Sequence, residues 1–129
     1  MLEQFYNYII HLLSAFMMIG VYTAIYLKIT PFDEIALIRK GGVAAALSFG
    51  GTTLGFSLTV ASSILHSDTY TIFLMWTGAA ALVQILTYLF ISKMLPTLND
   101  DLNNNNVAMG AFLGSLSLIV GIINAACLS

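Results

Sequence analysis

Residues 42–65 read GVAAALSFGGTTLGFSLTVASSIL, and no aspartate, glutamate, lysine or arginine interrupts them. A hydrocarbon core about 30 Å thick is crossed by a helix of about 20 mostly apolar residues. The length and composition of the stretch therefore predict a transmembrane helix. Small residues are typical of membrane helices that pack closely on their neighbours, so we expect this span to be sandwiched between two others.

Three further stretches are long, apolar and free of charged residues, namely residues 5–27, 70–92 and 107–128. Of the 129 residues, 59% are hydrophobic and 8% are charged, and the mean hydropathy is +0.93. An average soluble domain is about 45–50% apolar and about 25% charged, so this composition excludes a soluble globule. We expect one all-α membrane domain over residues 1–129, with four transmembrane helices.

The few charges exclude some functions and predict an orientation. A net charge of −2 with four basic residues argues against nucleic acid as a partner. One cysteine, Cys127, excludes an intrachain disulfide and a multi-cysteine metal site. The basic residues follow the first or the third span: Lys28, Arg39, Lys40 and Lys93. The positive-inside rule therefore places both long loops in the cytoplasm and both termini outside.

The loop after the first span contains the signals of a helix start. Thr30 fits an N-cap, Pro31 a first-turn proline and Asp33 an acid at the third position. We therefore expect a short helix over residues 31–40. It either lies at the membrane interface or continues the second span toward the cytoplasm.

The same loop ends in two glycines, Gly41 and Gly42, which are suited to terminate or bend a helix. Three apolar residues at a spacing of three give the expected helix one apolar side: Phe32, Ile35 and Ile38. The other long loop, residues 96–106, is polar and asparagine-rich, and we expect it to be flexible.

The two halves of the chain resemble each other. Residues 28–31 read KITP and residues 93–96 read KMLP, at an offset of 65. Residues 42–44 read GVA and residues 106–108 read NVA, at an offset of 64. These matches predict two tandem helical hairpins in parallel orientation, related by an axis along the membrane normal.

Lines of small or polar residues run along the second and fourth spans. In the second span one line consists of Gly41, Ala45, Ser48, Thr52, Gly55, Thr59, Ser62 and His66, and a second line of Ala46, Gly50, Thr53 and Ser57. In the fourth span the line consists of Gly110, Gly114, Ser117, Gly121 and Asn124. Spans one and three are bulkier, so we expect them on the outside.

Glycine is costly within a helix but allows two backbones to approach closely in a membrane. We expect the packing glycines to be Gly50, Gly51, Gly55, Gly110, Gly114 and Gly121. Spans two and four should cross near Gly50 and Gly114, while Leu54 and Leu58 should face lipid.

The polar residues within the spans allow two interpretations. They are either intramembrane hydrogen-bonding groups or the lining of a polar path: Ser48, Thr52, Thr59, Ser62, Gln84 and Asn124. An unpaired amide is costly in hydrocarbon, so Gln84 must face protein or water. Hydrogen bonding of Gln84 to a serine or threonine of span two is the structural interpretation, and contact with a substrate is the functional one.

A second polar group lies toward the expected outer side, and it comprises His11, Ser14, His66 and Asp68. Its spacing is unsuited to zinc, and no catalytic motif or pair of intramembrane acids occurs, so we expect neither a cofactor nor an enzyme. Five of the six tyrosines and the tryptophan are expected in interfacial belts; they are Tyr6, Tyr8, Tyr22, Tyr26, Trp76 and Tyr88.

Several blocks resemble one protein family. They are TPFDE at residues 30–34, LIR at 37–39, GGVAAA at 41–46, Gly50–Gly51, Trp76, Gln84, Val107–Ala108 and NAA at 124–126. The chain thereby resembles the YjfL-like family of small bacterial inner-membrane proteins, whose domain has no known function. The resemblance implies four spans in the bacterial cytoplasmic membrane and genetic neighbours connected with envelope stress and polyamines. It supplies no biochemical activity.

Two functional hypotheses follow. In the first, the chain is a membrane anchor or partner for cytoplasmic proteins in envelope maintenance, bound through loop 28–41 with Asp33, Glu34, Arg39 and Lys40 as the contact residues. In the alternative, it is a subunit of a homo-oligomeric channel or small-solute transporter. Four helices enclose little space alone, so the alternative needs several copies of the chain.

Overall fold

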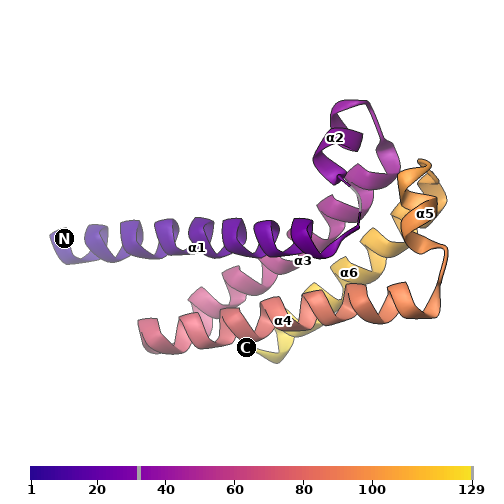
Figure 1. The fold of residues 1–129 in the computed structure, drawn as a ribbon. Coiled ribbons are helices and arrows are strands. Elements are labelled where there is room, and N and C mark those ends of the chain that lie inside the picture. Colours follow the sequence, from indigo (N-terminus) through magenta and orange to yellow (C-terminus); the bar gives the residue numbers. More distant parts are fainter. Residues whose placement is uncertain (32, 129) are drawn as a thin grey trace.

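The computed structural model describes residues 1–31 and 33–128, which form six helices and no strand (Figure 1). The helices are α1 (Leu2–Ile29), α2 (Glu34–Arg39), α3 (Val43–His66), α4 (Tyr70–Met94), α5 (Leu98–Asn103) and α6 (Val107–Cys127). Four of them, α1, α3, α4 and α6, are long and apolar enough to cross a membrane. The prediction of an all-α protein with four spans is confirmed, and each span begins and ends within a few residues of its predicted bounds.

The centre of the bundle is the pair of α3 and α6. Gly110 lies against the backbone of Ala44 and Gly121 against that of Gly55, so closely that an added Cβ would collide with backbone atoms. Early residues of one helix thus meet early residues of the other, and late residues meet late ones. The two helices are therefore parallel and in register.

Hydroxyl groups of α3 reinforce this contact. Thr59 Oγ1 donates a hydrogen bond to the carbonyl oxygen of Gly121 at 3.0 Å, and Ser62 Oγ donates to that of Ala125 at 2.6 Å. Such bonds form because the glycines bring the α6 backbone within reach of short side chains. Close packing and interhelical hydrogen bonding therefore have the same cause.

Gly51, not Gly50, faces Gly114 at the middle of the pair. A Cβ on Gly51 would collide with the Gly114 backbone, whereas nothing lies within 4 Å of the Cβ position of Gly50. Successive residues of a helix point about 100° apart. Choosing Gly50 in place of Gly51 therefore puts the predicted contact on the lipid-facing side of α3. The prediction that Gly50 packs on Gly114 is wrong, although Leu54 and Leu58 are exposed as expected.

The second small line of α3 is likewise on the outside. Its members Ala46 and Gly50 are exposed and Thr53 and Ser57 are half-buried. With Leu47, Ala111 and Ser115, Ala46 and Gly50 border a shallow groove between α3 and α6. Helix α3 packs against α6, α4 and α1, so it does lie between neighbours, but its second small line is not the surface that they cover.

Helices α1 and α4 pack on the outside of the pair, as the sequence predicts (Figure 1). The five tyrosines expected in interfacial belts divide into two groups. Tyr6 and Tyr8 are exposed, like Trp76, but Tyr22, Tyr26 and Tyr88 are at most 2% exposed. The prediction of interfacial belts is thus wrong for these three, because their rings fill the space that α1 and α4 leave beside the small residues of α3.

Helix α2 begins later than predicted. Its N-cap is Asp33, whose carboxylate accepts a hydrogen bond from the amide of Ala36 at 3.2 Å. Thr30 instead caps the end of α1, where its hydroxyl donates back to the carbonyl oxygens of Tyr26 and Leu27. The expected N-cap at Thr30 is therefore wrong, and Phe32, assigned to the apolar side of this helix, lies outside the described residues.

The expected termination by glycine is confirmed. The amide of Gly42 donates to the carbonyl oxygen of Leu37 at 2.8 Å and that of Gly41 to Ile38 at 3.0 Å, which is a Schellman motif. Gly41 has a φ of +86°, a left-handed conformation that suits glycine. A Cβ on Gly42 would lie 2.7 Å from the carbonyl oxygen of Leu37.

The second loop is helical, so the expectation of flexibility is wrong. Helix α5 buries Leu98 and Leu102 completely and ends like α2. The amide of Asn106 donates to the carbonyl oxygen of Asp101, and Asn105 adopts a φ of +60°. Helices α2 and α5 stand 64 positions apart in the chain, the offset already seen between the halves. That the halves form two tandem hairpins stays a prediction.

We expect replacement of Gly51 by leucine to destabilise the fold. The new side chain would push α6 away, and overpacking of this kind costs about 1–3 kcal/mol or more. The melting temperature of the detergent-solubilised protein should fall, and less folded protein should reach the membrane.

Gly50→Leu is the matched control, because the same bulk is added one residue away on the exposed side, where substitutions cost about 0.5 kcal/mol or less. Equal losses from Gly50→Leu and Gly51→Leu would contradict the observed helix rotation.

Candidate functional site

The two short helices lie at the same end of the bundle, and we name α2 and α5 the loop cap (Figure 1). Each is anchored by its first residue. Leu98 of α5 and Glu34 of α2, which stand 64 positions apart, are both 0% exposed. An apolar anchor is ordinary, but a glutamate at the equivalent position brings a carboxyl group into the protein interior.

The carboxyl group of Glu34 is buried without a hydrogen bond, since neither of its oxygens has a partner among the described residues. Three buried tyrosines are within electrostatic range of the carboxyl group, namely Tyr22 and Tyr26 of α1 and Tyr88 of α4. The surroundings therefore favour the neutral acid over the carboxylate.

The tyrosines hold the loop cap to the spans. The rings of Tyr26 and Tyr88 meet edge to face with centroids 5.4 Å apart, which joins α1 to α4. Tyr22 stacks on Phe56 of α3 at 4.4 Å. The hydroxyl of Tyr88 donates to Oδ1 of Asn99 at 2.5 Å, which joins α4 to α5. The tyrosines near Glu34 therefore connect α1, α3, α4 and α5.

Burial raises the pKa of the Glu34 carboxyl group from 4.5 to about 8. Desolvation is the cause, since burial penalises the charged form of a carboxylic acid. An acid with a pKa near 8 is largely protonated at neutral pH and titrates within the physiological range.

The expected partner residues do not form one surface. Asp33, Arg39 and Lys40 are exposed, but Glu34 is fully buried. Its inclusion in a partner-binding surface is therefore wrong, because the helix that presents the other three charges is anchored through it. Asp100 of α5 adds another exposed charge to the loop cap.

Several of the polar residues within the spans form hydrogen bonds between helices. Thr52 Oγ1 lies 2.5 Å from the hydroxyl of Tyr22, and Ser48 Oγ donates to the carbonyl oxygen of Ala45 within its own helix. Gln84 Nε2 donates to the carbonyl oxygens of Thr52 and Ser117 at 3.1 and 3.3 Å. Gln84 thus ties α4 to both central helices.

Two amide atoms in the spans are buried without a hydrogen-bond partner among the described residues, Oε1 of Gln84 and Nδ2 of Asn124. They lie in different places, since Gln84 faces the middle of α3 while Asn124 is near the end of α6. The predicted polar residues therefore form separate contacts, mostly with backbone carbonyl groups.

The residues of the expected outer cluster are divided among separate contacts. Ser14 Oγ lies 2.5 Å from the hydroxyl of Tyr70, and the His11 ring lies against that of Tyr70 at 5.9 Å. His66 Nδ1 donates to the carbonyl oxygen of Ser62 within α3. Asp68 is exposed in the following turn. Within residues 1–31 and 33–128 no three potential ligands gather to hold a metal ion.

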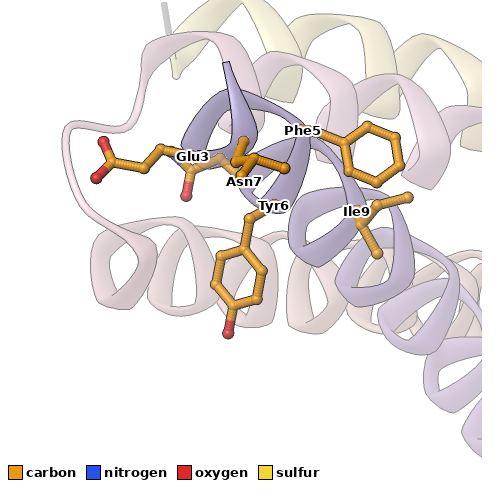
Figure 2. A pocket seen from close by; sticks show the side chains of 6 residues that line it. Glu3, Phe5, Tyr6, Asn7 and Ile9 are labelled. Carbon is orange, nitrogen blue, oxygen red and sulfur yellow. The ribbon is translucent and has the colours of Figure 1, made fainter.

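The start of α1 borders a wide, open hollow, shown in Figure 2. Its lining comes from a single stretch of one helix: Leu2, Glu3, Phe5, Tyr6, Asn7 and Ile9. The first five of these side chains are exposed and the sixth is half-buried. The hollow is open surface, with no second element to close it around a ligand.

Sequence reasoning missed the buried acid and its tyrosines. Two signals were present. Tyr22, Tyr26 and Thr30 recur at intervals of four along the end of α1, and all are buried. The 64-residue offset also aligns Glu34 with Leu98, which marks the glutamate as a core position.

We expect Glu34→Leu to stabilise the protein at a pH of about 8, because it places an apolar anchor where Leu98 stands in the other half. Burial of an unpaired polar group costs about 1–3 kcal/mol, so the melting temperature should rise, and the gain should grow with pH.

The reciprocal change, Leu98→Glu, is the matched control and should lower the melting temperature. Destabilisation by Glu34→Leu would mean that the carboxyl group has a partner that stabilises it.

Comparison with known proteins gives the family. The family model described as Domain of Unknown Function (DUF350) matches residues 1–128. The inner membrane protein YjfL of Escherichia coli, described as UPF0719, is 36% identical over 121 residues, 90% of this chain and 92% of the relative, in both the K12 and the O157:H7 strain. No solved structure matches. The resemblance to this family is therefore confirmed, and the chain is a multi-pass inner-membrane protein that belongs to the DUF350 family.

Proposed function

We propose that this protein is a non-enzymatic membrane partner for cytoplasmic proteins, and that the loop cap is its docking surface. The observation that carries the proposal is that both short helices are anchored by buried side chains. Glu34, Leu98 and Leu102 are fully buried, so two loops that need only connect spans instead form a folded surface. A preorganised surface binds with a smaller entropic cost than a flexible loop.

The charges of the loop cap support this proposal. Arg39 and Lys40 at the end of α2 are exposed, as is Asp100 on α5. Exposed charges of both signs suit an electrostatically steered protein partner. A role in envelope maintenance is the cellular context that we propose.

The orientation is part of the proposal. All four basic residues lie at the end of the bundle that bears the loop cap: Lys28, Arg39, Lys40 and Lys93. The termini and the turn between α3 and α4 lack lysine and arginine. The positive-inside rule therefore favours a cytoplasmic loop cap.

The hydrogen bonds within the spans support the alternative function, a channel, less well than they support a purely structural role of these polar residues. Thr59 and Ser62 donate to backbone carbonyl groups of α6, and Gln84 donates to those of α3 and α6. Hydroxyl and amide groups that join helices are unsuited to line a path, so we assign them to packing.

Charge reversal at Arg39 and Lys40 together should weaken capture of a cytoplasmic partner. If the pair contributes about 1.4 kcal/mol, affinity falls about tenfold. Co-purification from cross-linked cells followed by mass spectrometry measures this, with the charge-reversed Glu3 and Asp68 variant, altered at the opposite end, as the control. Unchanged recovery of the same proteins would refute the loop cap as the docking surface.

Labelling with a membrane-impermeant maleimide tests the orientation. The exposed Cys127 should react in cells whose outer membrane alone is permeable. Asn104→Cys in a Cys127→Ser background should react only after the inner membrane is opened. The reverse pattern would place the loop cap outside the cell.

A further inference from the structure

Glu34 is a buried acid at a position where the structure requires only an apolar anchor. The equivalent residue of the other short helix is leucine, and both side chains are 0% exposed. Both carboxyl oxygens of Glu34 lack a hydrogen-bond donor among the described residues. An ionised carboxylate here would lose its hydration without replacement, at a cost of several kcal/mol in general.

The groups that face Glu34 supply no compensating positive charge. From α1 they are Tyr22 and Tyr26, and from α4 Tyr88. The charged residues of its own loop, Asp33 and Arg39, are exposed. The elements α3 and α5 contribute no charge that acts on the Glu34 carboxyl group, whose titration is shifted by burial alone.

Helix α2 is bounded by residues at which the chain can change direction. Pro31 precedes it, and Gly41, with a φ of +86°, follows it. Its remaining contacts are modest, since Ile35 is exposed and Ala36, Leu37 and Ile38 are only half-buried. Glu34 is therefore the one fully buried side chain that anchors this helix among the described residues.

We propose that Glu34 is a proton-binding site that locks α2 against the bundle, so that the helix is docked when the carboxyl group is neutral and released when the group loses its proton. Release returns the carboxylate to water and leaves the α3–α6 pair in place, because the contacts of that pair do not involve α2. The ligand of the site is the proton itself.

The direction of the pH dependence follows from the pKa. Docking raises the pKa of Glu34 from 4.5 to about 8. At a pH between these two values, docking of α2 is therefore accompanied by uptake of a proton on Glu34. The contribution of Glu34 to docking is complete below about pH 4.5 and is lost as the pH rises toward about 8. Above about pH 8 the contribution of Glu34 to docking no longer changes with pH.

The lock does not depend on a partner, but its consequence for partner binding rests on the function proposed above. Helix α2 carries Arg39 and Lys40, so its release would rearrange that half of the docking surface. A rise in pH on the loop-cap side would then change which surface a partner meets.

Infrared spectroscopy and hydrogen exchange of the full chain in lipid nanodiscs test the lock without any partner. The infrared spectrum should contain a band from a protonated, buried carboxyl group at about pH 6 that disappears above about pH 8. The band should be absent from Glu34→Gln, the neutral variant of the same shape. If Glu34→Gln does not fold, Glu34→Leu serves as the control in its place.

Exchange of the α2 amides of residues 36–38 provides the conformational readout. The wild-type rate divided by the Glu34→Gln rate at the same pH removes the intrinsic pH dependence of exchange. This ratio should rise at least about tenfold between about pH 6 and about pH 9, since each pH unit below the docked pKa changes the docking equilibrium about tenfold.

Absence of the carboxyl band at about pH 6 would overturn the proton site. A band that titrates while the exchange ratio stays constant would overturn the lock. Failure of partner capture would leave both measurements unaffected, so the lock and the proposed function can fail separately.

Discussion

The contact between the backbones of α3 and α6 is the constraint on which the rest of this structure depends. Two helices in a membrane gain little from hydrophobic burial, because lipid is as apolar as their side chains. Their association depends on packing and on hydrogen bonds. Glycine at Gly51, Gly110 and Gly121 allows the backbones to touch, and that approach brings the hydroxyls of α3 within reach of α6 carbonyl groups. The remaining spans then pack around a rigid pair.

This arrangement separates the structural from the functional residues. Polar groups in the spans, such as Thr59 and Gln84, hold helices together through backbone carbonyl oxygens. Outside the spans, the chain builds two short helices of six residues each and anchors both. The α5 anchor is apolar and the α2 anchor is an acid. That difference between otherwise similar halves gives the protein a group that titrates near neutral pH, at the end that we assign to the cytoplasm.

The sequence predicts most of the fold, since hydropathy alone locates four uncharged stretches. It also predicts the glycine stop of α2, because Gly41 can adopt a positive φ. It fails where rotation about a helix axis matters. Neighbouring residues such as Gly50 and Gly51 differ by about 100°, and composition does not say which of them faces the partner helix. Hydropathy likewise cannot place Tyr22 in the core rather than at the interface, because an amphipathic ring suits both.

Glu34 shows a different limit. A glutamate in a polar loop is expected to be solvated, and its burial depends on how α2 folds back onto the spans. The alignment of the halves contains this information, since Glu34 falls opposite the core residue Leu98. A prediction based on composition nevertheless places a glutamate in solvent, because it considers the charge of the residue and not its position in the repeat.

Disulfide formation between α3 and α6 tests the central parallel pair most directly. The hydroxyl of Ser62 reaches the carbonyl oxygen of Ala125 at 2.6 Å near the ends of the two helices, so cysteines at these two positions would be neighbours. In a Cys127→Ser background, Ser62→Cys with Ala125→Cys should form an intramolecular disulfide on mild oxidation in membranes. Each single-cysteine variant serves as the control for links between molecules. Formation only of links between molecules, or of none, would contradict a core built on α3 and α6.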